Sequence, residues 1–139
     1  MSGFIVDTSA LISILVAEEG YVQLAEYMDT EVDAAISAAT LHEAFCVCTR
    51  QNLPRGAERL ERMVSLLEAE IVPFDAVQLV TARQAYREFG RGSGHRAGLN
   101  MGDCFSYALA KSLNAPLLYK GEDFGRTDIV SAATARAQP

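Results

Sequence analysis

The chain has few of the residues and segments that mark several classes of protein. Its three cysteines, Cys46, Cys48 and Cys104, are an odd number that does not suit a disulfide framework, so we expect buried, reduced thiols in a cytosolic protein. No apolar run approaches the ~18–20 residues that a membrane span requires. No Lys or Arg precedes the apolar run near the N-terminus, and Asp7 interrupts that run, so we expect no signal peptide and no membrane contact.

Basic residues are also scarce. Twelve Lys and Arg stand against 18 Asp and Glu, which gives a formal net charge of −6. Lys and Arg contacts to phosphate supply most of the affinity in loose binding to nucleic acid, so this protein needs a local basic patch or bound metal to bind RNA. One such patch is present, because Arg83, Arg87, Arg91 and Arg96 lie in a single segment opposed only by Glu88.

Proline and glycine do not divide the chain. The four prolines and ten glycines are scattered singly, except in the Gly-rich segment 90–94, and there is no repeat or low-complexity tract. Half of the 139 residues are hydrophobic, and a chain of this size buries roughly 68–70% of its unfolded surface. We therefore expect a single domain over residues 1–139, with a core that needs no disulfide or structural metal.

Short β-like runs alternate with longer helical runs, as in an α/β domain with a mainly parallel sheet. Strands are expected at 4–6, 34–36, 71–72, 116–119 and, as a last short strand, 129–130. Helices are expected at 8–16, 20–30, 41–50, from Pro54 to about 67, from the capping pair Asp75 and Gln78 to 89, and at 103–113. The pattern predicts a three-layer α/β/α sandwich.

Three acidic residues stand near the starts of expected helices. Asp7 directly follows the first strand, Glu43 lies within an otherwise apolar helix, and Asp103 begins another helix. Ligands of open α/β sheets bind at the carboxyl ends of the strands, where these acids would meet. Gathered carboxylates need a cation to offset their repulsion, and oxygen ligands without a Cys or His cluster favour Mg²⁺ or Mn²⁺ over zinc.

Each acid also has a purely structural interpretation. Asp7 suits the N-cap of the helix that follows it. The segment from Thr40 to Glu43 matches a capping box, in which the glutamate bonds back to the cap amide. Asp103 would favour the dipole of its helix in any case. The residues alone leave both interpretations open.

Four segments together resemble a PIN domain and, more narrowly, the VapC toxins of VapBC toxin–antitoxin modules. They are Phe4-Ile5-Val6-Asp7-Thr8-Ser9-Ala10-Leu11, Ile36-Ser37 with Glu43, the segment 99–110 and the segment 116–124. The resemblance covers nearly the whole chain. It implies a cytoplasmic, Mg²⁺-dependent endoribonuclease, with Mn²⁺ as a substitute, that acts as a toxin on RNA, forms a homodimer and binds a VapB-like antitoxin.

The resemblance also assigns residues. Asp7, Glu43 and Asp103 match the first three acids of the family. Many PIN domains place a fourth acid two residues before the Asp-Phe pair, but Gly121 stands there, so Asp123 or Asp128 must supply the fourth carboxylate. We favour Asp123.

The implied chemistry is hydrolysis by a metal-activated water held by the clustered carboxylates, which leaves 5′-phosphate and 3′-hydroxyl ends. Arg87, Arg91 and Arg96 would then hold RNA phosphates, unless their segment is only a solvated helix end with a flexible loop.

Two other functions stay open at this point. A phosphoacceptor receiver domain would use Asp7 at the end of a strand and Lys120 after a later strand, although the chain lacks the adjacent acidic pair that holds Mg²⁺ in such domains. A non-catalytic RNA-binding PIN module that has lost its metal would be consistent with Gly121 at the fourth acidic position.

Overall fold

The computed structural model describes residues 3–133. Its strands are β1 (Phe4–Val6), β2 (Ala34–Ser37), β3 (Glu70–Val72) and β4 (Leu117–Leu118). Its helices are α1 (Thr8–Leu15), α2 (Tyr21–Thr30), α3 (Ala38–Arg50), α4 (Gly56–Leu67), α5 (Ala76–Phe89), α6 (Met101–Leu113) and the 3₁₀ helix η1 (Phe124–Arg126). The four strands form one parallel sheet in the order β3-β2-β1-β4.

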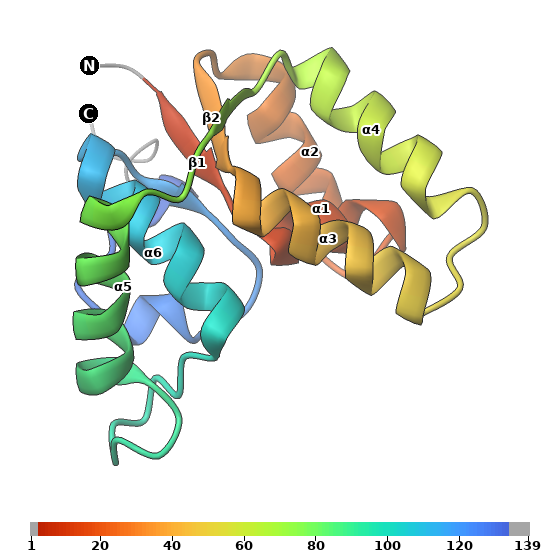
Figure 1. Cartoon of the computed structure of the whole chain (residues 1–139). Coiled ribbons are helices and arrows are strands. Elements are labelled where there is room, and N and C mark those ends of the chain that lie inside the picture. The colour runs from red at the N-terminus through yellow and green to blue at the C-terminus, as the bar shows by residue number, and fades with distance from the viewer. Residues whose placement is uncertain (1–2, 134–139) are drawn as a thin grey trace.

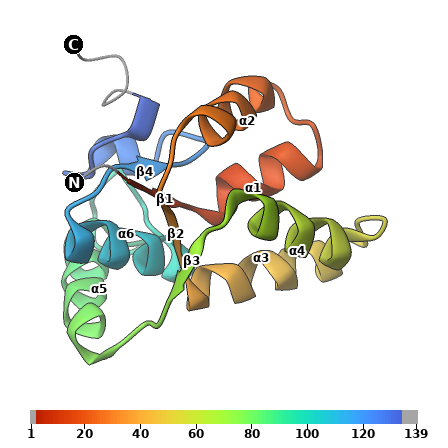
Figure 2. The same cartoon turned by 90° about the horizontal axis from the view of Figure 1, so that it is seen from above.

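Helices cover both faces of the sheet, so the predicted three-layer α/β/α sandwich is confirmed. Helices α1 to α4 lie on one face, and α5 and α6 lie on the other (Figures 1 and 2). The strands run downwards in Figure 1, so their carboxyl ends meet at the lower face of the molecule. Helices α1 and α3 begin at this edge, directly after β1 and β2, and so bring Asp7 and Glu43 to it.

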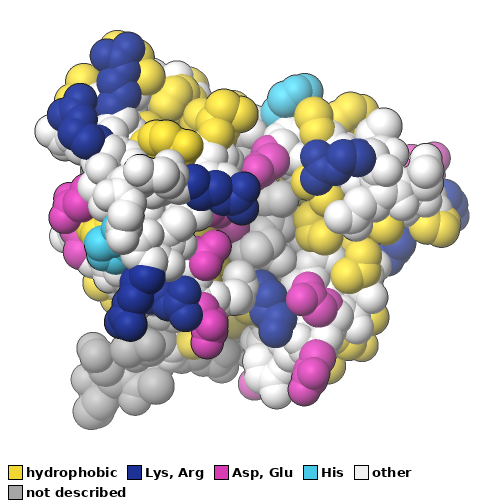
Figure 3. All heavy atoms as spheres, turned by 90° about the horizontal axis from the view of Figure 1, so that it is seen from below, with side chains coloured by type: hydrophobic (Ala, Val, Ile, Leu, Met, Phe, Trp, Pro, Cys, Tyr) yellow, Lys and Arg dark blue, Asp and Glu magenta, His cyan; other side chains and the backbone are white. Residues whose placement is uncertain are grey.

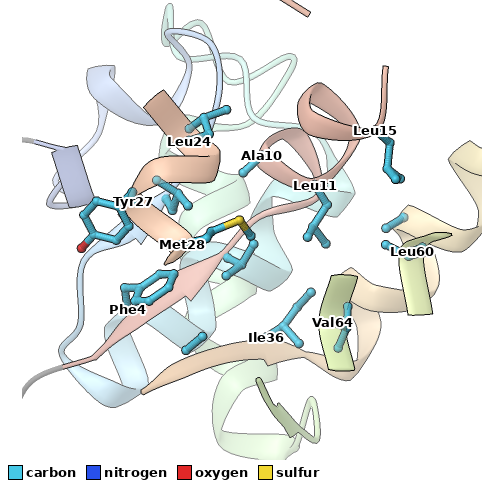
Figure 4. Packing of buried hydrophobic residues seen from close by; sticks show 14 of the residues in the cluster. Phe4, Ala10, Leu11, Leu15, Leu24, Tyr27, Met28, Ile36, Leu60 and Val64 are labelled. Carbon is cyan, nitrogen blue, oxygen red and sulfur yellow. The ribbon is translucent and has the colours of Figure 1, made fainter. Parts of the chain in front are cut away.

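Alternation within the strands builds a core on each side of the sheet. Successive side chains of a strand point to opposite faces, so Phe4 and Val6 join the cluster under α1 to α4, whereas Ile5 joins the cluster under α5 and α6. Phe4 meets the ring of Tyr27 edge to face, with the centroids 5.0 Å apart. Figure 4 shows this side of the core, in which α1, α2 and α4 all contribute apolar side chains.

Helix α3 begins earlier than predicted, and this overturns the capping box at Thr40. Ser37 is the N-cap, and its hydroxyl accepts a hydrogen bond from the Ala39 amide at 3.2 Å. Thr40 is therefore already helical and fully buried. Glu43 lies in the second turn, where it cannot bond back to the cap amide.

Two other helix starts differ from the prediction. Helix α4 begins at Gly56, and not at Pro54, because Arg55 takes a left-handed conformation (φ 52°) as N-cap. Helix α6 begins at Met101, because the side chain of Asn100 caps it by accepting from the Asp103 amide at 2.8 Å. A polar side chain just before the helix decided this start.

The expected cap at Asp75 is confirmed in part. Its carboxylate accepts from the Gln78 amide at 2.9 Å, but the Gln78 side chain donates to the carbonyl oxygen of Pro73. The predicted strand at 129–130 is wrong, because these residues form no strand. The segment contacts β4 through a hydrogen bond from the Leu117 amide to the carbonyl oxygen of Val130 at 2.9 Å and an isolated bridge between Leu117 and Ser131.

The expectation of three buried thiols is wrong for one of them. Cys48 and Cys104 are buried, whereas Cys46 is exposed on α3, with its sulfur 3.4 Å from Nε2 of His42. Over residues 3–133, no helix combines the length and the apolar character needed to cross a bilayer.

Candidate active site

Asp7 lies at the junction of β1 and α1, and its side chain is only 2% exposed. Its Oδ2 accepts hydrogen bonds from the amide of Ser9 at 3.0 Å and from the hydroxyl of Ser9 at 2.7 Å. Its Oδ1 accepts from the hydroxyl of Ser106 on α6 at 2.5 Å. Asp7 is thus the N-cap of α1, and the same carboxylate is held from the far side of the sheet edge.

Glu43 points into the protein from the second turn of α3. Its Oε1 accepts from the hydroxyl of Thr8 at 2.7 Å, and its Oε2 lies against Gly102 on α6. Burial raises the pKa of Glu43 above its usual range, and the charge of Asp7 adds to this, although the Thr8 hydrogen bond and the charge of Arg50 oppose it. A carboxylate in this place has neighbours of like charge and is not a helix cap.

Asp103 is the third residue of α6. It forms a reciprocal capping box with Asn100, whose amide donates to Oδ2 of Asp103 at 2.9 Å. Burial, together with the charges of Asp7, Asp123 and Glu43, raises the pKa of Asp103 to about 7, against the hydrogen bond from the Asn100 amide. The other three acids are therefore close enough to Asp103 to act on it through their charges.

The structure treats the two candidates for the fourth acid differently. Asp123 lies directly before η1, is exposed, and acts on Asp103 through its charge. Asp128 is engaged elsewhere, because it accepts from Nζ of Lys111 at 2.5 Å and from the hydroxyl of Tyr107 at 2.7 Å. Partial burial raises the pKa of Asp128, but these hydrogen bonds and the charge of Lys111 outweigh it and lower the pKa.

The lower face of the molecule, where the carboxyl ends of the strands meet, is hollowed (Figure 3). Figure 3 shows acidic side chains in a hollow between two halves of this face, with Lys and Arg side chains around it. Hydroxyl groups join the elements here, since Thr8 reaches Glu43 and Ser106 reaches Asp7. As the side chains stand, no three acidic, His or Cys residues within 3–133 converge tightly enough to hold a metal ion.

Sequence reasoning missed three of the residues that build this site. Thr40 was interpreted as a helix cap, and Ser106 and Gly102 were not singled out. The sequence carries one signal for Ser106, because this serine lies between Phe105 and Tyr107 in the mostly apolar middle of α6. Nothing local marks Gly102, whose role depends on the side chain of Glu43 crossing it.

The basic segment lies beside this site and is more ordered than a free loop. Arg87, Arg91 and Arg96 are all exposed. The amide of Arg91 donates to the carbonyl oxygen of Leu99, and the Leu99 amide donates to that of Phe89, both at 2.9 Å. Nη1 of Arg126 donates to the carbonyl oxygen of Arg96 at 3.3 Å, which connects the segment to η1 and hence to the neighbourhood of Asp123.

The model of the PIN domain matches residues 4–130. The chain belongs to the PIN domain family. Because the PIN model matches nearly the whole chain, the receiver alternative is wrong.

Relatives within the PIN family are similar along nearly the whole chain. Ribonuclease VapC42 of Mycobacterium tuberculosis is 40% identical over 130 residues, which are 94% of this chain and 99% of that protein. Ribonuclease VapC28 of the same species is 42% identical over 132 residues, which are 95% of this chain and 99% of that protein.

Solved structures agree on the PIN fold at much lower identity. The crystal structure of Mycobacterium tuberculosis VapC20, described as a toxin that cleaves the sarcin–ricin loop, superposes with a TM-score of 0.73 at 16% identity, over 93% of this chain and 98% of that chain. The structure of FitAcB from Neisseria gonorrhoeae gives a TM-score of 0.69 at 20% identity, over 92% of this chain and 95% of that chain.

Proposed function

We propose that this protein is a VapC-type ribonuclease, the toxin of a toxin–antitoxin pair, and that it cuts RNA with Mg²⁺ held by Asp7, Glu43, Asp103 and Asp123. Membership of the PIN family and close similarity to VapC ribonucleases carry the enzyme class and the toxin role. The observation that carries the site is the raised pKa of Asp103, to which Asp7, Asp123 and Glu43 all contribute. Like charges brought together at a sheet edge are typical of a cation site.

The residues present fit a divalent cation. All four candidate ligands are carboxylates, the donors that Mg²⁺ and Mn²⁺ prefer. When bound, Mg²⁺ would activate a water molecule and offset the negative charge of the phosphate. The chain itself orients the ligands, since Ser9 and Ser106 hold Asp7, Thr8 holds Glu43, and the Asn100 amide holds Asp103.

The proposal is tested by incubating the purified protein with RNA at increasing Mg²⁺ or Mn²⁺ concentration and identifying the ends of the products. We expect cleavage that requires the metal, stops in EDTA, and leaves 5′-phosphate and 3′-hydroxyl ends. Cyclic 2′,3′-phosphate ends, or full activity in EDTA, would contradict the mechanism. RNA binding without cleavage under any metal condition would support the non-catalytic PIN module.

Asp123→Ala and Asp128→Ala should differ in effect. Asp123 acts on Asp103 through its charge, so its removal should weaken both the metal-dependent rise in melting temperature and cleavage, by about tenfold or more. Asp128 is occupied by Lys111 and Tyr107, so its removal should leave cleavage unchanged and lower stability by less than about 1 kcal/mol, as for exposed ion pairs. Equal loss of cleavage in both variants would contradict this assignment.

The basic segment should bind RNA phosphates through Arg87, Arg91 and Arg96 and should not contribute to metal binding. Changing all three to Ala should weaken RNA binding and flatten its dependence on salt, by a slope of about 0.7 per lost contact for single-stranded RNA. The metal-dependent rise in melting temperature should not change. The control replaces Arg55 and Arg62, two exposed arginines at α4. If the triple variant binds RNA with an unaltered salt dependence, the basic segment only connects α5 to α6 and does not contact RNA phosphates.

The antitoxin is the second partner. Several structures with this fold are toxin–antitoxin complexes, among them one from Klebsiella pneumoniae and VapBC2 from Rickettsia felis. A groove between α1, α2 and α4 suits an apolar and basic segment of a VapB-like antitoxin, because its described lining combines apolar side chains with four acids and no base. The lining residues are Ile14, Ala25, Met28, Val32, Met63, Leu66, Leu67, Asp29, Glu31, Asp33 and Glu68.

A homodimer is supported by exposed apolar side chains on two other surfaces. Phe45 and Ile71 lie beside α3 and α4, and Tyr86 and Met101 lie beside α5 and α6.

Leu66→Glu should abolish copurification with the VapB-like antitoxin when the two proteins are coexpressed. Leu66 lines the groove and is 73% exposed, so glutamate there should leave the fold intact. It should remove an apolar contact with the ligand and place in the interface a charge that loses its water on binding. RNA cleavage by the purified toxin should not change. Val77→Glu is the matched control, since Val77 is 71% exposed on α5, on the other face of the sheet. Retained copurification of Leu66→Glu would place the antitoxin elsewhere.

A further inference from the structure

Two buried hydroxyl groups form a chain that ends on Asp7. Ser106 on α6 and Thr40 on α3 are both 0% exposed. The Oγ1 atom of Thr40 lies 3.2 Å from Oγ of Ser106, and Oγ of Ser106 lies 2.5 Å from Oδ1 of Asp7. Three elements that are far apart in the sequence are thus joined by side chains that water does not reach.

The direction of these hydrogen bonds follows from the groups themselves. An ionised carboxylate has acceptors only, and a hydroxyl has a single proton to donate. Ser106 must therefore donate to Asp7, and Thr40 must donate to Ser106. The hydrogen bonds therefore run one way, from Thr40 through Ser106 to the carboxylate of Asp7.

The hydrogen bonds also leave one oxygen of Asp7 more open than the other. Each carboxylate oxygen accepts about two hydrogen bonds. Oδ2 already accepts two, from the amide and the hydroxyl of Ser9. Oδ1 accepts one, from Ser106, and therefore keeps a lone pair for a cation.

We infer that Ser106, supported by Thr40, is a positioning residue that fixes the Asp7 carboxylate so that it ligates the metal through Oδ1 alone. The inference rests on the proposed function and deepens it. Groups that hydrogen-bond to a metal ligand orient it, and their loss typically costs 10–100-fold in metal affinity or activity. If Ser106 had only a structural role, its substitution would lower the stability of the fold and leave metal affinity unchanged.

The test compares Ser106→Ala with Ser13→Ala in the full-length protein. Ser13 is also 0% exposed, and its hydroxyl has no hydrogen-bond partner within residues 3–133, so it controls for the loss of a buried hydroxyl. The first measurement is the melting temperature against Mg²⁺ or Mn²⁺ concentration without RNA, and the second is kcat and KM for RNA. We expect Ser106→Ala to raise the half-saturating metal concentration 10–100-fold, with KM for RNA unchanged, and Ser13→Ala to match the wild type.

Two substitutions at Thr40 keep the test decisive if Ser106→Ala fails to fold. Thr40→Val keeps the shape and removes the hydroxyl, whereas Thr40→Ser keeps the hydroxyl and removes a methyl group. We expect Thr40→Val to weaken metal binding several-fold with little loss of stability, and Thr40→Ser to lower stability with wild-type metal binding. If Thr40→Ser weakened metal binding and Thr40→Val did not, the hydrogen bonds from Thr40 to Asp7 would serve only packing, and the inference would be wrong.

Asp7→Asn separates this inference from the proposed function. If Asp7→Asn abolishes both the metal response and cleavage while Ser106→Ala and Thr40→Val keep both, the inference is wrong and the proposed function stands. If Asp7→Asn itself keeps both, the proposed metal site fails, and the inference fails with it.

Discussion

Replacing Asp103 with asparagine should abolish RNA cleavage and remove most of the metal-dependent rise in melting temperature. Asparagine keeps an acceptor for the Asn100 amide, so the capping box that starts α6 survives. What is lost is the charge that lies among those of Asp7, Glu43 and Asp123. A ligand that binds only the folded state raises its melting temperature by mass action, so a lost metal response reports lost metal binding. An unchanged metal response would exclude Asp103 from the site.

The same substitution should change how stability depends on pH without metal. The folded-state pKa of Asp103, about 7, lies above its ordinary value of 3.8. Its contribution to stability is therefore fully present below about pH 4 and is lost as the pH rises through about 7. The metal-free wild type should lose stability over this interval, and Asp103→Asn should lose less, with a residual slope from the raised pKa of Glu43. Equal slopes would show that the carboxyl of Asp103 titrates normally.

Gly102→Ala should inactivate the enzyme while leaving its fold intact. A Cβ at this position would lie 1.8 Å from Oε2 and 2.4 Å from Cδ of Glu43, so the carboxylate would have to move. The moving atoms are the end of a flexible side chain, and alanine favours a helix over glycine by up to about 1 kcal/mol. Stability should thus hold or rise. Cleavage should fall by about 10²-fold, as expected for a displacement of about 1 Å in an active site.

A second background shows whether the effect of Gly102→Ala passes through Glu43. With Glu43→Ala in place there is no carboxylate to displace, so adding Gly102→Ala should change neither the metal response nor RNA binding. The melting temperature should still rise slightly, because alanine favours the helix more than glycine does. A cleavage rate of Gly102→Ala close to that of the wild type would mean that Glu43 works from a different position.

Much of the architecture could be predicted from local pattern. The four main strands and six helices came from hydrophobic periodicity and from the runs between them, because period 2 and period 3.6 are properties of the chain itself. Helix starts were less predictable. Ser37, Arg55 and Asn100 each cap a helix that the pattern began elsewhere. A cap depends on the backbone angles of one residue, which neighbouring apolar residues do not reveal.

The sequence by itself determined the order of the elements, the likeness to PIN domains and the three acids Asp7, Glu43 and Asp103 as candidates. Only the tertiary structure decided that Glu43 lies near Asp7 and does not cap a helix. It also decided that Asp128 forms an ion pair with Lys111 and a hydrogen bond with Tyr107, away from the other acids.

It also decided which groups hold the acids. Ser106 and Asp7 are 99 positions apart in the chain, and Glu43 crosses Gly102 from another helix. Such contacts arise where helices from both sides of the sheet meet at one edge, and their geometry follows from packing over the whole domain, which no local pattern encodes.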